Sequence, residues 1–360
     1  MFFTILIALT SLLILVSLHE LGHFFTAKKF GVKVEEFGLG YPPKLFGKKF
    51  RGTLYSINLL PFGAFVRIPE EADDSPSSFT NKPLWQRALI IFNGALVFWL
   101  VGAVLFSIVF MVGSPTIVDD AETGFADLKV QISAISPDSP AQVAGLKVGD
   151  VVLMAQGLES RPQNINQVKE LQDFISDNKG QEVVLTIKRG GQTFELSAVP
   201  RLSPPAGQAP LGVSLVRTGL KSYPWYLAWF QGIKATFEMT AMIISAYGQS
   251  LARIFQGAPS GLELMGPVGI VGILSQGIEM GLSYFLQMIG FLSINVAILN
   301  LLPIPAFDGG KLLFLGIEAV RKKPVPRQVE ERITTVFFAL LIILMVFVTI
   351  KDIRNFRGLL

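Results

Sequence analysis

SLHELGHF, residues 17–24, is the most informative stretch of this sequence, because it places an H-E-x-x-H motif inside an apolar run. On a helix, residues four apart share a face, so His19 and His23 can present two imidazole nitrogens to one metal ion. Glu20 lies beside them, where its carboxylate can take a proton from a metal-bound water. The alternative is a pair of core histidines in a membrane helix, but a glutamate buried in hydrocarbon between them is costly unless it has a function.

The composition is that of a membrane protein. Hydrophobic residues make up 51% of the chain and charged residues 16%, and the mean hydropathy is +0.51. Each long uncharged run approaches the roughly 20 residues needed to cross a bilayer. These runs are residues 2–18, 88–112, 282–302 and 333–350. We therefore expect four transmembrane helices, the first of them retained, because it lacks a basic leader and a small-residue cleavage site.

The charges predict how these spans are oriented. Residues 26–84 hold nine Lys and Arg and residues 304–332 hold six, whereas residues 113–281 hold 12 basic and 15 acidic side chains. Basic flanks of spans lie in the cytoplasm, so the long middle segment is expected outside. The net charge of +4 therefore reflects topology and gives no case for nucleic acid. The absence of cysteine excludes thiolate metal ligands.

Residues 28–84 are expected to form a β segment on the cytoplasmic side, because glycines and prolines punctuate β-branched and alternating residues. Its loop at residues 59–65, LLPFGAF, is too apolar for a solvated turn. Two interpretations stay open: an ordinary small β cap, and a strand edge that pairs with an extended peptide. Residues 70–78 are acidic and rich in Ser and Pro, which predicts a mobile connector.

Residues 120–202 predict a soluble α+β domain. A strand at 130–135, an amphipathic helix at 165–175 and a hairpin around Gly190-Gly191 are expected. The string S-P-A-x-x-A-G-L-x-x-G-D at residues 139–150 resembles a PDZ domain of the bacterial protease type. Such domains accept an extended peptide or a protein C-terminus at a sheet edge. A steric module that binds no peptide is the alternative.

After a linker, residues 223–255 predict a helix with apolar and charged side chains on opposite faces and with Trp225 and Trp229 as anchors. This pattern favours a helix that lies in the outer membrane interface, although a fifth span stays open.

The third span carries a second motif, N-x-x-P-x-P-x-x-D-G, at residues 300–309. Its prolines and glycines stop the helix and are expected to hold Asp308 in irregular backbone at membrane depth. Catalytic zinc commonly takes three protein ligands, so Asp308 is predicted to join His19 and His23. A helix cap is the alternative role. The extended motif H-E-x-x-H-x-x-G-x-x-H fails, because Thr26 and Lys29 occupy its Gly and His positions.

Together these motifs resemble the site-2 protease family of intramembrane zinc metalloproteases, in its bacterial regulator-of-sigma-E-protease branch. PFGAFV at residues 61–66 is similar to the family's membrane-associated β-loop, and GPVGI at residues 266–270 is similar to its segment before the third span. Two departures stand out: Phe307 replaces a usual Leu, and Phe98 occupies the Asn position of an A-G-P-x-x-N pattern.

The resemblance implies that Zn2+ is held by His19, His23 and Asp308 and that Glu20 is the general acid/base. It further implies substrate contacts at these five residues: Asn300, Phe62, Gly63, Ala64 and Phe65.

The predicted fold is a polytopic α-helical membrane protein with four transmembrane helices, a cytoplasmic-side membrane-associated β segment and one extracytoplasmic α+β PDZ domain. The predicted order begins with a first span (1–27), a β segment with its connector (28–84), a second span (85–113) and the PDZ domain (120–202). A linker with the interfacial helix (203–281), a third span (282–310), a cytoplasmic connection (311–332) and a fourth span (333–351) follow.

The resemblance implies a multi-pass endopeptidase of the bacterial cytoplasmic (inner) membrane. It would cleave transmembrane segments of single-span proteins, such as anti-sigma factors or remnant signal peptides, after another protease has trimmed them. The rival hypothesis is a PDZ-containing membrane scaffold or chaperone with a structural metal, which requires a fourth protein ligand, and the sequence offers no further His or Cys. A transporter would require internal repeats of spans, and the sequence contains none.

Overall fold

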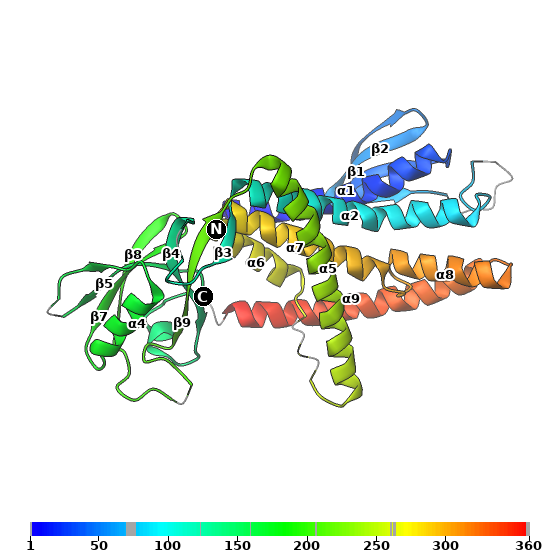
Figure 1. Cartoon of the computed structure of the whole chain (residues 1–360). Helices are drawn as coiled ribbons and strands as arrows, with labels where there is room; N and C mark the ends of the chain where they lie inside the picture. The colour runs from blue at the N-terminus through cyan, green and yellow to red at the C-terminus, as the bar shows by residue number, and fades with distance from the viewer. Residues whose placement is uncertain are drawn as a thin grey trace. The chain divides into compact units, whose positions relative to one another are not determined.

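The computed structural model describes residues 2–69, 77–122, 124–158, 160–205, 207–259, 261 and 264–357. The predicted connector at 70–78 therefore lies mostly outside the described residues. The protein forms two compact units, and most of their elements are labelled in Figure 1. The first unit comprises residues 1–106, 230–275 and 287–360, and the second comprises residues 107–229 and 276–286.

Apolar helices build most of the first unit. Within the described residues, four helices are long and apolar enough to cross a membrane, judged by length and composition. They are α1 (Phe2–Lys29), α2 (Leu84–Val112), α7 (Leu282–Leu301) and α9 (Arg327–Arg357). The four predicted spans are thereby confirmed as helices. The bounds of α1 and α2 agree with the predicted ones to within two residues, whereas α7 ends nine residues before the predicted end at residue 310 and α9 is longer at both ends.

The described residues contain three further helices of more than ten residues: α5 (Trp225–Phe255), α6 (Pro267–Met280) and α8 (Asp308–Arg321). The predicted helix at 223–255 is confirmed as α5, which is not among the four candidate spans. Its place in the interface stays a prediction. α6 and α8 were not expected, because their short apolar patterns follow glycines and prolines that usually mark loops.

α8 corrects the expectation that Asp308 lies in irregular backbone. Asp308 is the first residue of α8, so the irregular stretch is confined to residues 302–307. An acidic side chain in the first turn suits the positive end of the helix dipole. The helix ends where Lys322 adopts a left-handed conformation, two residues before Pro324, which is a common way to terminate a helix.

Close helix contacts in this unit depend on a small residue and on polar side chains. A Cβ added to Gly22 of α1 would lie 2.7 Å from the carbonyl oxygen of Asn93 in α2, so only glycine allows this approach. Asn93 Nδ2 also donates to Thr26 Oγ1 of α1. Between α7 and α2, Ser293 Oγ donates to the carbonyl oxygen of Phe98 at 2.7 Å.

The predicted β segment forms an antiparallel pair, β1 (Glu36–Phe50) and β2 (Thr53–Arg67). Residues 36–39 pair both with residues 54–57 and with residues 64–67, whereas residues 44–50 pair with residues 53–58. The pair is therefore a sheet of four short segments, as the punctuating glycines and prolines indicated. Residues 64–67 form one of its outer edges.

An antiparallel sheet forms most of the second unit. Its strand order is β3-β9-β4-β5-β7-β8, and β6 pairs with β5 alone. The strands are β3 (Ser114–Ile117), β4 (Ala126–Ile135), β5 (Val151–Gly157), β6 (Gln163–Asn164), β7 (Val183–Arg189), β8 (Gln192–Ala198) and β9 (Val213–Lys221). The two helices are α3 (Pro140–Val143) and α4 (Val168–Asp177). The strand, helix and hairpin expected within residues 120–202 are all present.

The sheet extends beyond the predicted bounds of 120–202. β3 precedes them, and β9 lies in the segment that was expected to be a linker. β9 pairs with both β3 and β4, across more than 75 residues of sequence, and such non-local pairing leaves no mark in a local pattern.

This sheet has its own hydrophobic core. Val130, Val152, Leu171, Leu185 and Ile187 are among its fully buried side chains, and α4 contributes its apolar face. A closed core of this kind is what an independent domain requires.

Candidate metal centre

Three side chains converge in the first unit. His19 and His23 project from one face of α1, and Asp308 projects from the first turn of α8. The two Nε2 atoms are 3.2 Å apart, and Asp308 Oδ2 lies 3.4 Å from His19 Nε2 and 3.3 Å from His23 Nε2. Within the described part of the sequence, this is the only cluster of three such side chains suited to a metal ion.

The triangle fits a zinc ion. Ligand bonds of about 2.0–2.1 Å at tetrahedral angles place neighbouring ligand atoms about 3.3–3.4 Å apart, which matches the three observed separations. Asp308 Oδ2 is buried and accepts no hydrogen bond of normal geometry from the described residues. A buried carboxylate oxygen without a hydrogen bond raises the free energy of the folded protein unless a cation compensates its charge. Three ligands leave the fourth position for water or substrate.

A backbone group of α2 selects the tautomer of His23. Its Nδ1 lies 2.8 Å from the carbonyl oxygen of Ile90, which can only accept, so Nδ1 carries the proton. The lone pair of Nε2 then points toward His19 and Asp308. Hydrogen bonds of this kind orient the histidine ligands of most metal sites.

Gly94 of α2 gives both imidazole rings their space. A Cβ at this position would overlap His23 Nε2 and the ring of His19. Sequence reasoning assigned no role to Ile90 or Gly94, because a backbone acceptor and a missing side chain have no pattern of their own. The neighbouring Asn93-Gly94 pair within a predicted span was the one available signal.

Glu20 lies against the β segment, as its predicted role requires. It is within electrostatic range of His23 and Asp308, and the backbone N–H of Val66 in β2 hydrogen-bonds to its carboxylate. The outer edge at residues 64–67 therefore reaches the residue that follows His19. The basic side chain of Lys311, three residues into α8, acts electrostatically on both Glu20 and Asp308.

The other predicted substrate residues divide into two groups. Phe62, Gly63, Ala64 and Phe65 all lie in β2, immediately before or within the edge that reaches Glu20. The ring of Phe65 stacks on Tyr41 of β1, with ring centroids 6.0 Å apart. Asn300 instead lies in the last turn of α7, and no described contact joins it to the three ligand atoms.

An ion pair fixes α8 relative to α2. Arg87 Nη1 lies 2.9 Å from Glu318 Oε1, and both side chains are largely buried. The guanidinium also lies over the ring of Phe79. Leu315 of α8 packs into an apolar cluster with Phe24 of α1. These contacts hold the helix that carries Asp308 against the helices that surround the histidines.

The protein has four apolar helices and a centre of three ligand side chains that joins α1 to α8. These two features are those of a membrane metalloprotein. Comparison with known proteins specifies the family. Residues 7–344 match Peptidase family M50. The chain is 36% identical to a Clostridium perfringens protein with the words zinc metalloprotease in its name, over 97% of this chain and 98% of that protein. It is 30% identical to the zinc metalloprotease RasP of Oceanobacillus iheyensis, over 95% of this chain and 96% of the relative.

The chain therefore belongs to Peptidase family M50. It is a multi-pass membrane protein of a metalloprotease family, and the metal in the names of its relatives is the one that the ligand triangle fits.

Proposed function

We propose that this protein is a zinc-dependent intramembrane endopeptidase of the site-2 protease type. His19, His23 and Asp308 hold the zinc, and Glu20 is the general acid/base. The observation that carries the proposal is the triangle of ligand atoms 3.2–3.4 Å apart, two of them on a helix apolar enough to span the bilayer. The zinc metalloprotease names of the relatives support the same conclusion.

The chemistry divides between the metal and Glu20. A zinc ion in this position supplies Lewis acidity to the scissile carbonyl and lowers the pKa of a bound water. The Glu20 carboxylate accepts a proton from the attacking water and delivers it to the leaving amine. Its hydrogen bond with the Val66 backbone keeps the carboxylate oriented during both transfers. The aspartate ligand differs from the histidines in bringing a negative charge, which offsets the charge of the cation.

A membrane helix hides its peptide bonds in its own hydrogen bonds, so the substrate has to unwind near the site. The outer edge at residues 64–67 offers backbone groups to which an extended peptide can add as a strand. This edge begins next to Glu20, so pairing would bring the peptide to the base. Phe62, Gly63, Ala64 and Phe65 would contact the substrate there, and Asn300 would position it from α7.

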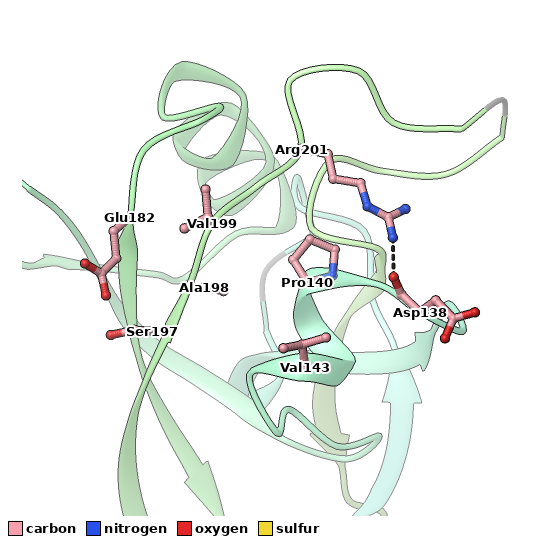
Figure 2. A pocket seen from close by; sticks show the side chains of 8 residues that line it. All are labelled: Asp138, Pro140, Val143, Glu182, Ser197, Ala198, Val199 and Arg201. Carbon is pink, nitrogen blue, oxygen red and sulfur yellow. Dashed lines mark hydrogen bonds between the residues drawn. The ribbon is translucent and has the colours of Figure 1, made fainter.

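The sheet domain is proposed to be one PDZ domain outside the cytoplasmic (inner) membrane. Two observations support this: the string at 139–150, which forms α3 and the turn into β5, and the balance of charges in residues 113–281. A pocket of roughly 400 Å³ lies between α3 and the end of edge strand β8, where a peptide or a protein C-terminus would find room (Figure 2). Charged and apolar side chains mix in its lining: Asp138, Glu182, Arg201, Pro140, Val143 and Val199.

A domain of this size next to the membrane would keep out substrates with bulky outer domains. The enzyme would then act on single-span proteins that another protease has already trimmed, such as anti-sigma factors or remnant signal peptides. The lipid bilayer is its other partner, and nothing in the charge distribution favours nucleic acid.

The test is cleavage of a purified transmembrane peptide by the full-length protein in detergent. A chelator should stop cleavage and added zinc should restore it. Glu20→Gln should lower the rate by about 10²–10⁴-fold, the usual contribution of a general base, while the zinc content stays at one per protein molecule. An undiminished rate in this variant would contradict the mechanism. Retained zinc with no hydrolysis by the wild type would favour the scaffold with a structural metal.

A further inference from the structure

We infer that Phe98 is a positioning residue for His19: stacking against its ring holds the His19 imidazole in the metal-binding orientation. This inference rests on the proposed zinc site. Phe98 lies in α2 one helical turn after Gly94 and two turns after Ile90, so the three residues share one face of the helix.

The need for such a residue arises from a difference between the two histidines. His23 is oriented by the hydrogen bond from its Nδ1 to Ile90. His19 Nδ1 is buried but makes no hydrogen bond of normal geometry with the described residues. Rotation of the His19 ring about its Cβ–Cγ bond would carry Nε2 away from the centre. The backbone of Gly94 interacts with this ring, but Nδ1 has no hydrogen bond like that of His23 to oppose the rotation.

The ring of Phe98 supplies the missing restraint. Its centroid lies 4.6 Å from that of the His19 ring, and the two planes are within 12° of parallel. The ring of His23 meets His19 edge-on, also at 4.6 Å and at 86°. The Phe98 ring is thus stacked on one face of the His19 ring, and the His23 ring meets it at a right angle. Offset-stacked and T-shaped contacts are the arrangements that aromatic rings prefer.

Phe98 is itself closely packed, which a restraint requires. Only 1% of its surface is exposed, and it packs with Leu15 of α1 and Ala297 of α7. Its carbonyl oxygen accepts the hydrogen bond from Ser293 of α7. Three helices therefore determine where this ring lies, and the ring in turn determines the plane of the imidazole.

A phenyl ring has no hydrogen-bond donor or acceptor of its own. The restraint that Phe98 places on His19 is consequently made by shape and ring contact rather than by a hydrogen bond.

Phe98→Leu tests this role, because leucine keeps an apolar side chain but removes the ring. Phe106→Leu is the matched control: Phe106 lies two turns further along α2, is 2% exposed, and packs near Gly290 of α7. Both variants create a similar cavity, so loss of stability alone affects them equally. Zinc affinity is measured by chelator competition on the full-length protein, and the absorption bands of the Co2+-loaded protein report the ligand geometry.

We expect zinc binding about 10-fold weaker in Phe98→Leu, the lower end of the usual effect of losing an orienting contact, with altered Co2+ bands. Phe106→Leu should match the wild type in both. Equal zinc affinities and equal spectra for the two variants would overturn the inference. If Phe98→Leu does not fold, Phe98→Met fills more of the volume and enters the same comparison. Failure of the wild type to bind zinc would instead overturn the proposed function.

Discussion

The sheet domain and the helices around the metal centre differ in where their apolar and polar side chains lie. In the sheet domain the interior is apolar, with Val130 and Leu185 fully buried, whereas polar side chains of the edge strand β8 such as Thr193 and Glu195 are exposed. In the helical unit most of the large apolar side chains of α9 are exposed, whereas His19 and Ser293 are buried. Lipid is as apolar as leucine, so burial of leucine gives little drive for helix association in a membrane.

This difference teaches which contacts matter in each region. The sheet domain gains its stability from the hydrophobic effect, at about 25 cal/mol per Å² of apolar surface removed from water. The helices around the centre depend on close approach at glycines and on a few polar contacts, such as those of Gly22 and Asn93. Substitutions in the two regions should therefore have different effects. Near the centre they should impair function in a folded protein, and in the sheet domain they should cause unfolding.

The largest effect is expected from Gly94→Ala in α2. The added Cβ would overlap both histidine rings, and it meets their side chains rather than solvent. We expect zinc affinity to fall by at least about 100-fold, the upper end of effects from groups around a metal site. Zinc content after dialysis against a weak chelator measures this.

Gly316→Ala in α8 is the control for Gly94→Ala, because a Cβ there meets nothing within 4 Å. It should bind zinc like the wild type and gain helix propensity. Full zinc occupancy in Gly94→Ala would show that the histidines are not held as described.

Asp150→Ala should damage the sheet domain and leave the metal centre intact. Asp150 is fully buried, and its carboxylate accepts hydrogen bonds from Arg189 Nε at 2.7 Å and from the backbone of Lys147. The Asp150 hydrogen bonds hold the pKa of Arg189 above its ordinary value. Loss of the carboxylate leaves a half-buried guanidinium unpaired, so we expect a cost of about 2–4 kcal/mol.

Hydrogen exchange of β5 and β7 in the full-length protein measures that cost, with zinc affinity followed in parallel. Asp173→Ala, at an exposed position of α4, is the control and should change neither. Loss of zinc in Asp150→Ala would mean that the two regions are energetically coupled, contrary to the comparison.

The smallest effect is expected from Glu318→Gln, which weakens the ion pair that holds α8. The amide retains a hydrogen bond to Arg87 but loses the charge attraction between two largely buried side chains. We expect zinc binding about 3–10-fold weaker, equivalent to about 1 kcal/mol for a pair of this kind. Glu331→Gln removes an exposed pair with Arg327 in α9 and should have no measurable effect on zinc. Identical affinities for the two variants would exclude a role of the ion pair in placing Asp308.

Several features of the fold and of the site could be predicted from short stretches of sequence. The four apolar runs, the β segment and the amphipathic helix α4 are confirmed, because hydropathy and periodicity are local properties. His19, His23 and Asp308 lie together, and their role as zinc ligands stays a prediction. The histidine pair could be predicted from its helical spacing. The aspartate could be predicted because it is a carboxylate next to a span and beside prolines that end a helix.

By itself the sequence determined the candidate donor residues, the four long apolar runs and the order of the main elements, since these depend on residue types and on spacings of a few positions. Only the tertiary structure decided what surrounds the donors. The carbonyl of Ile90, the space beside Gly94 and the ring of Phe98 each act on a histidine ring. They can do so only because α2 lies against α1. Likewise β9 joins the sheet through backbone pairs with strands far away in the sequence. Such contacts are set by three-dimensional packing, which no local pattern encodes.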